Sequence, residues 1–80
     1  MITPAQCRAA RALLKWKQEE LAARASVGVS SVRTFEVEKT TPHNSTLRLL
    51  KETFEKAGVE FIAEGEVPQH PAGAGVRLKE

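Results

Sequence analysis

Apolar residues recur every three or four positions through most of the chain, which is the spacing of one face of an α-helix. The first such stretch opens with Thr3, which can cap a helix, and Pro4, which suits the first helical position. Gln6 stands three residues after Thr3 and can complete a capping box. We therefore predict a helix that ends near Lys15, with its apolar residues at Cys7, Ala10, Leu13 and Leu14.

Two shorter helices are predicted next, joined by a tight turn. Residues 18–25 form the first helix, residues 26–28 form the turn, and the second helix runs from residue 29 to about residue 37. Ala22 and Ala25 are small and allow the two helices to cross closely. The inward-facing residues of the second helix are Val32 and Phe35.

The pattern is broken by Pro42, so residues 39–43 are predicted to form a loop. A fourth helix follows, capped by Asn44 or Ser45 and terminated by Gly58. Its apolar residues repeat at i, i+3, i+7 and i+10. This spacing predicts that the helix buries Leu47, Leu50, Phe54 and Ala57.

Beyond residue 58 the helical spacing gives way to a strand-like pattern. Residues 59–63 predict a strand, and the alternating residues 75–79 predict a possible second one. Residues 64–74, which are rich in glycine and proline, are expected to form a mobile loop. We expect a helical domain over residues 1–58 and a strand–loop–strand extension over residues 59–80, so the fold class is mainly α with a short C-terminal β-strand or hairpin.

Length and composition narrow the class of protein. Eighty residues make one small domain with a modest core. No apolar run is long enough to span a bilayer, and the N-terminus does not look like a secretory signal. Cys7 is the single cysteine, so an internal disulfide is impossible, and with His43 and His70 it has no metal-ligand spacing. We expect a cytoplasmic protein without a metal or cofactor.

Charge is unevenly distributed along the chain. Residues 1–51 contain nine basic and four acidic residues, a net charge of +5, whereas residues 52–80 contain three basic and six acidic residues, a net charge of −3. The basic N-terminal part of the chain suggests that a polyanion binds on that side of the protein. The alternative is a solvated charged surface without a partner.

The outward face of the second short helix carries groups that suit the edges of DNA bases. Arg33 can fork onto guanine, and Val29 can contact a thymine methyl group. The hydroxyls of Ser30 and Thr34 can donate or accept hydrogen bonds. The first turn of the preceding helix offers free backbone N–H groups to a phosphate, with Gln18 beside them.

Most of the chain resembles the lambda-repressor-like, Xre/Cro-type helix-turn-helix transcriptional regulators. The resemblance covers roughly residues 5–58 and rests on Gln18-Glu19-Glu20-Leu21-Ala22, Arg24-Ala25, Val27, Val32 and Phe35-Glu36. It implies a compact domain of four to five helices, double-stranded DNA as the partner, and the second short helix in the major groove.

The resemblance also implies roles for individual residues. It assigns base reading to Val29, Ser30, Arg33 and Thr34. A structural ion pair joins Arg11 of the first helix to Glu36 at the end of the third. The implied phosphate contacts are Gln18, Lys39, Thr40, Thr41, His43 and Asn44.

The chain departs from the family pattern at the ends of the short helices. Lys15 and Lys17 stand where many relatives have Gly and Ser. These lysines either contact DNA or are only solvated, and Lys17 is one of our candidate phosphate contacts. Ser26 occupies a turn position that is often glycine, so it must tolerate the turn geometry. Gly28 stands where serine or threonine usually caps the next helix.

The strands of the C-terminal extension need a partner, because a lone strand leaves a row of unpaired backbone groups. They pair with each other, with another subunit, or with both. Regulators with this motif commonly work as dimers on two-fold operators. We therefore expect a homodimer interface, with an intramolecular hairpin over the core as the alternative; the interface residues are Val59, Phe61, Ile62, Val76 and Leu78.

The sequence thus predicts a small transcriptional regulator that binds a palindromic operator as a homodimer. An enzyme is not expected, because neither Cys7 nor the histidines have a nucleophile–base arrangement. One alternative is an antitoxin that regulates its own promoter and binds a toxin through its tail. Another is a protein-interaction module that binds no DNA.

Overall fold

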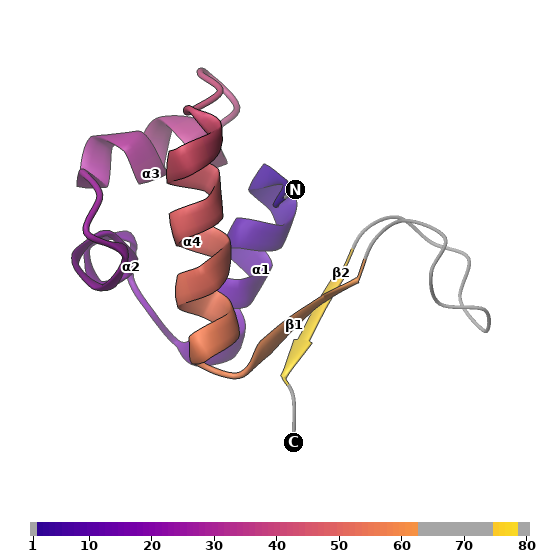
Figure 1. The fold of residues 1–80 in the computed structure, drawn as a ribbon. Coiled ribbons are helices and arrows are strands. Elements are labelled where there is room, and N and C mark those ends of the chain that lie inside the picture. Colours follow the sequence, from indigo (N-terminus) through magenta and orange to yellow (C-terminus); the bar gives the residue numbers. More distant parts are fainter. Residues whose placement is uncertain (1, 63–74, 79–80) are drawn as a thin grey trace.

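In the part of the chain that the structure describes, four helices enclose one apolar core. A two-stranded hairpin lies beside the helices (Figure 1). The computed structural model describes residues 2–62 and 75–78. Its elements are α1 (Pro4–Leu14), α2 (Gln18–Ala25), α3 (Val29–Glu36), α4 (Asn44–Lys56), β1 (Val59–Ile62) and β2 (Gly75–Leu78). The predicted class, mainly helical with a short C-terminal β-hairpin, is confirmed.

Local signals set the ends of the first three helices. The hydroxyl of Thr3 accepts a hydrogen bond from the backbone of Gln6, whose side chain accepts one from the backbone of Thr3, so the predicted capping box is present. Ser26 ends α2 in the left-handed region, with φ of 58°. Gly28 precedes α3 in an extended conformation and offers no side-chain cap. The turn between α2 and α3 therefore uses Ser26 in a conformation that glycine adopts more easily.

The start of α4 corrects one prediction. Asn44 is the first helical residue and His43 is the N-cap, so the cap that we predicted at Asn44 or Ser45 was wrong. The backbone N–H of Leu47 donates to the carbonyl of His43 at 3.1 Å, which sets the first turn. The side chain of His43 makes no capping hydrogen bond, and histidine is not a preferred N-cap, so capping preference gave no signal for this helix start.

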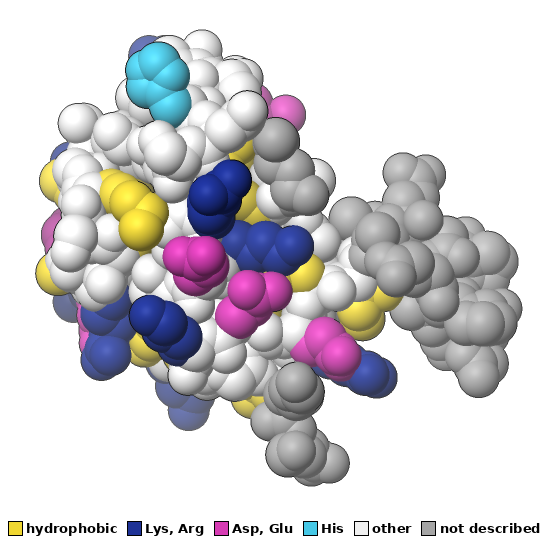
Figure 2. Space-filling view, in the orientation of Figure 1, with side chains coloured by type: hydrophobic (Ala, Val, Ile, Leu, Met, Phe, Trp, Pro, Cys, Tyr) yellow, Lys and Arg dark blue, Asp and Glu magenta, His cyan; other side chains and the backbone are white. Residues whose placement is uncertain are grey.

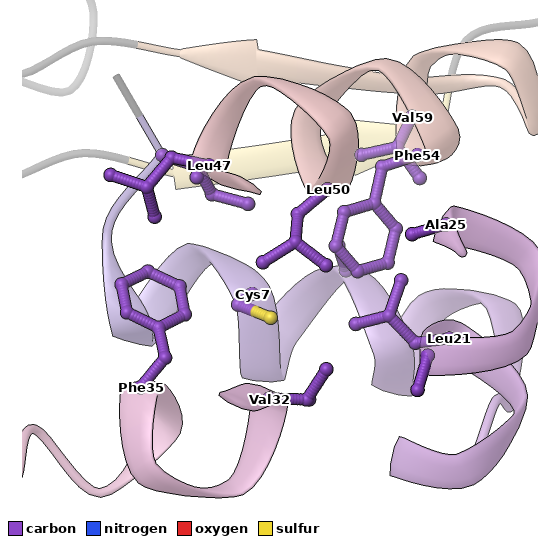
Figure 3. Close-up of a cluster of buried hydrophobic side chains, with 12 residues drawn as sticks. Cys7, Leu21, Ala25, Val32, Phe35, Leu47, Leu50, Phe54 and Val59 are labelled. Carbon is purple, nitrogen blue, oxygen red and sulfur yellow. The ribbon is translucent and has the colours of Figure 1, made fainter. Parts of the chain in front are cut away.

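Phe54 lies at the centre of the core, fully buried between elements from both halves of the chain (Figure 3). Its ring stacks on Trp16 with centroids 5.8 Å apart and meets Phe61 at 6.0 Å. The remaining buried apolar side chains come from the N-terminus, all four helices and β1: Ile2, Cys7, Ala10, Leu21, Ala22, Ala25, Val32, Phe35, Leu47, Leu50 and Val59.

Two apolar residues are exposed to solvent, although helical spacing placed them on the core-facing side of their helices. Ala57 is exposed, because α4 ends at Lys56 and the chain turns at Gly58, where φ is 97°. Val59 enters the core in its place. Leu13 is 38% exposed, so the buried face of α1 is narrower than its apolar residues suggested.

The C-terminal strands pair with each other in an antiparallel hairpin, with Val59 opposite Leu78 and Ile62 opposite Gly75. Gln6 of α1 is buried, and its Nε2 donates to the carbonyls of Gly75 at 3.0 Å and of Ile62 at 3.3 Å. One side chain therefore ties both strands to the first helix. The predicted loop over residues 64–74, and the strand ends at residues 63 and 79, lie outside the described residues.

Candidate nucleic-acid interface

A buried carboxylate at the end of α3 joins the three N-terminal helices. The side chain of Glu36 is 2% exposed and accepts hydrogen bonds from Nε and Nη2 of Arg11, each at 2.7 Å. Gln18 Nε2 and Cys7 Sγ donate to the same carboxylate, each at 3.1 Å. We call these four residues the Glu36 cluster. Because Cys7 and Arg11 belong to α1 and Gln18 to α2, the cluster fixes the position of α3 against both helices.

The surroundings keep the Glu36 cluster in one protonation state. Burial by itself raises the pKa of Glu36, but the hydrogen bonds from its three partners and the charge of Arg11 outweigh burial and hold that pKa below its ordinary value. Burial and the adjacent carboxylate raise the pKa of the Cys7 thiol, so the thiol stays protonated and can donate. At neutral pH the cluster is an ionised carboxylate neutralised by a guanidinium.

The four residues of α3 that were predicted to read bases fall into two pairs that differ in exposure. Phe35 anchors the opposite face in the core. Ser30 and Arg33 are exposed. Val29 is half-buried and packs against the core, and Thr34 is half-buried as well. The accessible polar groups of this face are therefore concentrated on Ser30 and Arg33.

The hydroxyl of Thr34 is already used within the protein. It donates to the carbonyl of Ser30 one helical turn earlier, at 2.9 Å. The hydroxyl of Thr40, in the connection between α3 and α4, donates to the oxygen of Thr34 at 3.0 Å. Thr34 thus has both its proton and one lone pair engaged, which leaves its methyl group as the part best suited to a base.

Arg33 reaches back across the turn to α2. Its Nη2 lies 3.1 Å from Oε2 of Glu19, and both side chains remain largely exposed, at 54% and 64%. The pair joins the first turn of α2 to the outward face of α3. A second pair on α2, between Glu20 and Arg24, lies within one helix and does not involve α3.

The residues predicted to contact phosphates lie at the start of α2 and after α3. Lys17 is the extended N-cap of α2 and its side chain makes no capping hydrogen bond. Gln18 is half-buried, with its amide directed to Glu36. The others are all exposed, in or beside the connection that follows α3: Lys39, Thr40, Thr41, His43 and Asn44.

The residues predicted to form a dimer interface differ in accessibility. Val59 is buried in the core of its own chain, and Phe61 and Val76 pack against that core. Ile62 is half-buried. Leu78 at 47% and Leu49 of α4 at 42% are the large apolar side chains that the hairpin and α4 leave most exposed. On the face shown in Figure 2, basic and acidic side chains are intermixed over α4.

A comparison with known families agrees with this geometry. The model of a helix-turn-helix family matches residues 8–61, well over half of the chain. The chain belongs to the lambda-repressor-like, Xre/Cro-type helix-turn-helix family. A search of curated proteins finds no match to it. Members of this helix-turn-helix family are DNA-binding regulators, which supports double-stranded DNA as the partner of this chain.

The described part of this helix-turn-helix protein has neither a metal-binding cluster nor a membrane-spanning helix. Residues 2–62 and 75–78 hold no group of three His, Cys, Asp or Glu side chains that could bind a metal ion. Nor does any helix in these ranges have the length and apolar character needed to cross a membrane.

Some contacts at the interface had no clear signal in the sequence. Acidic residues in a first helical turn are favoured by the helix dipole, so Glu19 looked ordinary there. Its distance from Arg33 depends on how the turn folds α2 onto α3, which the spacing alone does not give. The contacts that sequence reasoning missed are Glu19 with Arg33, Gln18 with Glu36 and Thr40 with Thr34.

Proposed function

We propose that the chain is a transcriptional regulator that recognises a specific duplex sequence by placing α3 in the major groove. The observation that carries the proposal is the combination of a firmly held helix and an exposed polar face. Glu36 and Phe35 fix α3 from the inside, while Ser30 and Arg33 extend from the outside. A helix of this kind fits the major groove, where arginine and hydroxyl side chains distinguish base pairs.

Phosphate contacts would hold the helix in register. The exposed residues after α3, from Lys39 to Asn44, lie next to the end of the proposed recognition helix. Lys17 and the free backbone N–H groups at the start of α2 provide a second contact region. Contacts of this type contribute affinity for any duplex and orient the protein without reading sequence.

The proposal includes a homodimer on a palindromic operator. A two-fold site is the common arrangement for this motif, because each subunit places one helix in successive turns of the groove. Leu78 on the hairpin and Leu49 on α4 are exposed apolar side chains that such an interface could cover. Among the described residues β1 and β2 pair only with each other, so their outer edges are further candidate contact sites.

Selection from a random duplex pool, followed by titration of the selected site, tests DNA reading. Arg33→Ala is expected to reduce discrimination at one base-pair position by about 1–3 kcal/mol while affinity for random duplex largely survives. The control is Arg48→Ala, because Arg48 is exposed on α4 and carries the same charge. An equal loss on specific and random DNA would remove Arg33 as a reader, and failure to bind any duplex at low salt would overturn the function.

The dimer is tested separately by sedimentation velocity across a concentration series, with and without the selected duplex. We expect a dimer on DNA and a concentration-dependent dimer in solution. Leu78→Lys should shift the series toward monomer. A protein that remains monomeric at micromolar concentration and binds a single non-palindromic half-site would contradict the dimer and leave DNA reading intact.

A further inference from the structure

The contact between Arg33 and Glu19 is the feature of the interface that the function described above does not explain. Glu19 Oε2 lies 3.1 Å from Nη2 of Arg33, across the turn that joins α2 to α3. An exposed ion pair of this kind contributes little to stability, so the fold does not require it. Because Arg33 lies on the outward face of α3, the pair places the carboxylate of Glu19 where DNA is expected to approach.

We propose that Glu19 is a specificity-determining residue, which orients the Arg33 guanidinium for a guanine and disfavours its use on phosphates. The inference rests on the proposed function, because it concerns the same reading face. It adds a residue of α2 to a recognition surface that the resemblance placed on α3 alone.

The chemistry of the guanidinium makes both parts of this role possible. Arginine has five N–H donors in a planar fork, and the hydrogen bond to Glu19 uses one N–H of Nη2. Two adjacent N–H groups therefore remain for the O6 and N7 acceptors of guanine. With one side of the fork held by Glu19, fewer orientations of Arg33 compete with the one that reads the base.

The charge of Glu19 supplies the second part. The pKa of Glu19 lies below its ordinary value, because the carboxylate accepts a hydrogen bond from its own backbone N–H and because Arg33 lies beside it. Glu19 is therefore ionised at neutral pH and repels a phosphate that approaches Arg33. Guanine O6 and N7 carry no formal charge, so the repulsion weakens phosphate binding more than base reading.

Glu20 provides a matched control. It is the next residue of the same first helical turn, is exposed, and pairs with Arg24 on its own helix at 3.0 Å. Glu19→Gln and Glu20→Gln remove the same charge from the same turn and change the helix dipole interaction to a similar extent. A difference between the two variants therefore reports the contact with Arg33.

The experiment compares wild type, Glu19→Gln, Glu20→Gln, Arg33→Ala and the double variant Glu19→Gln/Arg33→Ala. Each is titrated against the selected duplex, against duplexes changed at single positions, and against random duplex. Glu19→Gln is expected to raise affinity for random duplex about two- to fivefold and to lower the ratio of specific to random affinity about three- to tenfold. Glu20→Gln should leave that ratio within about twofold of wild type.

The Arg33→Ala background decides whether the effect passes through the guanidinium. There, adding Glu19→Gln should no longer change discrimination at the position that Arg33 reads. The inference fails if Glu19→Gln leaves the specificity ratio unchanged, if Glu20→Gln changes it equally, or if the effect persists without Arg33. If wild type prefers no sequence, the proposed function fails first and the inference with it. Circular dichroism of each variant checks that the helices are retained.

Discussion

The replacement of Glu36 by glutamine tests whether the Glu36 cluster holds the recognition helix in place. The substitution keeps the size of the side chain but removes its charge and one of its two acceptor oxygens. Arg11, Gln18 and Cys7 would then share a single oxygen, and the new NH₂ group would face donors. The fold would retain its apolar core, so the cost should come from the cluster itself.

The geometry gives the size of the expected loss. Removing one partner of a fully buried ion pair costs about 3–5 kcal/mol. The side chain of Arg11 is 20% exposed, so water can partly hydrate a stranded guanidinium. We expect Glu36→Gln to lower the free energy of unfolding by about 2–4 kcal/mol at pH 7. For a domain of this size, the change corresponds to a fall in Tm of about 10–25 °C.

Urea unfolding followed by circular dichroism and by Trp16 fluorescence measures this loss. Glu52→Gln is the control, because Glu52 is exposed on α4 and loses the same charge. Its free energy of unfolding should stay within about 0.5 kcal/mol of wild type. A loss below about 1 kcal/mol in Glu36→Gln, relative to this control, would refute the view that the cluster positions α3.

The same pair of proteins should respond differently to acid. The folded pKa of Glu36 is lowered, so the unfolded chain takes up its proton first as the pH falls. The contribution of the carboxylate is therefore complete above the ordinary value of 4.5 and is lost as the pH falls through the lower folded value. The stability of wild type should approach that of Glu36→Gln in this window. A constant difference from pH 7 to about pH 3 would contradict the assignment.

Three further substitutions have distinct expected results. Gln6→Ala removes the donor to the carbonyls of Ile62 and Gly75, so the free energy of unfolding in urea should fall by about 1–3 kcal/mol. Amide hydrogen exchange should accelerate in the hairpin more than in α4, and uniform acceleration would contradict the view that Gln6 holds the strands to α1. Thr34→Val keeps the methyl group and should preserve discrimination on single-position duplex variants, whereas a loss of more than tenfold would show that the hydroxyl reads a base. Lys39→Ala should weaken binding to every duplex and reduce the salt slope by about 0.9 per lost phosphate contact, and an unchanged slope would remove Lys39 from the footprint.

The sequence predicted the helices where local chemistry determines them. The capping box of Thr3 and the terminator Gly58 lie where the pattern placed them, because both depend on residues within one turn. The error at Ala57 has a tertiary cause. The core takes Val59 from beyond the end of α4, and apolar spacing along one helix contains no information about that neighbour. The error at the cap of α4 has a local cause, because the side chain of His43 makes no capping hydrogen bond and capping preference gives no signal for it.

Interactions between elements were less predictable than the elements. Alternation of residues indicates a strand but not its partner, so the internal pairing of β1 with β2 and its tie to Gln6 required the structure. The pairing of Arg11 with Glu36 followed from the resemblance. The additional donors to that carboxylate depend on the crossing of α1, α2 and α3, and the contact of Glu19 with Arg33 depends on the conformation of the turn.

The two parts of DNA binding make different demands on this fold. α3 has eight residues and no side-chain N-cap, and isolated helices of fewer than about 12–15 residues are marginal in water. Its position therefore derives from the core and from Glu36 at its end. Base reading needs side chains held within about 0.5 Å, whereas attraction between lysines and phosphates tolerates movement. Damage to the Glu36 cluster should consequently abolish discrimination between sequences before it abolishes affinity for duplex DNA.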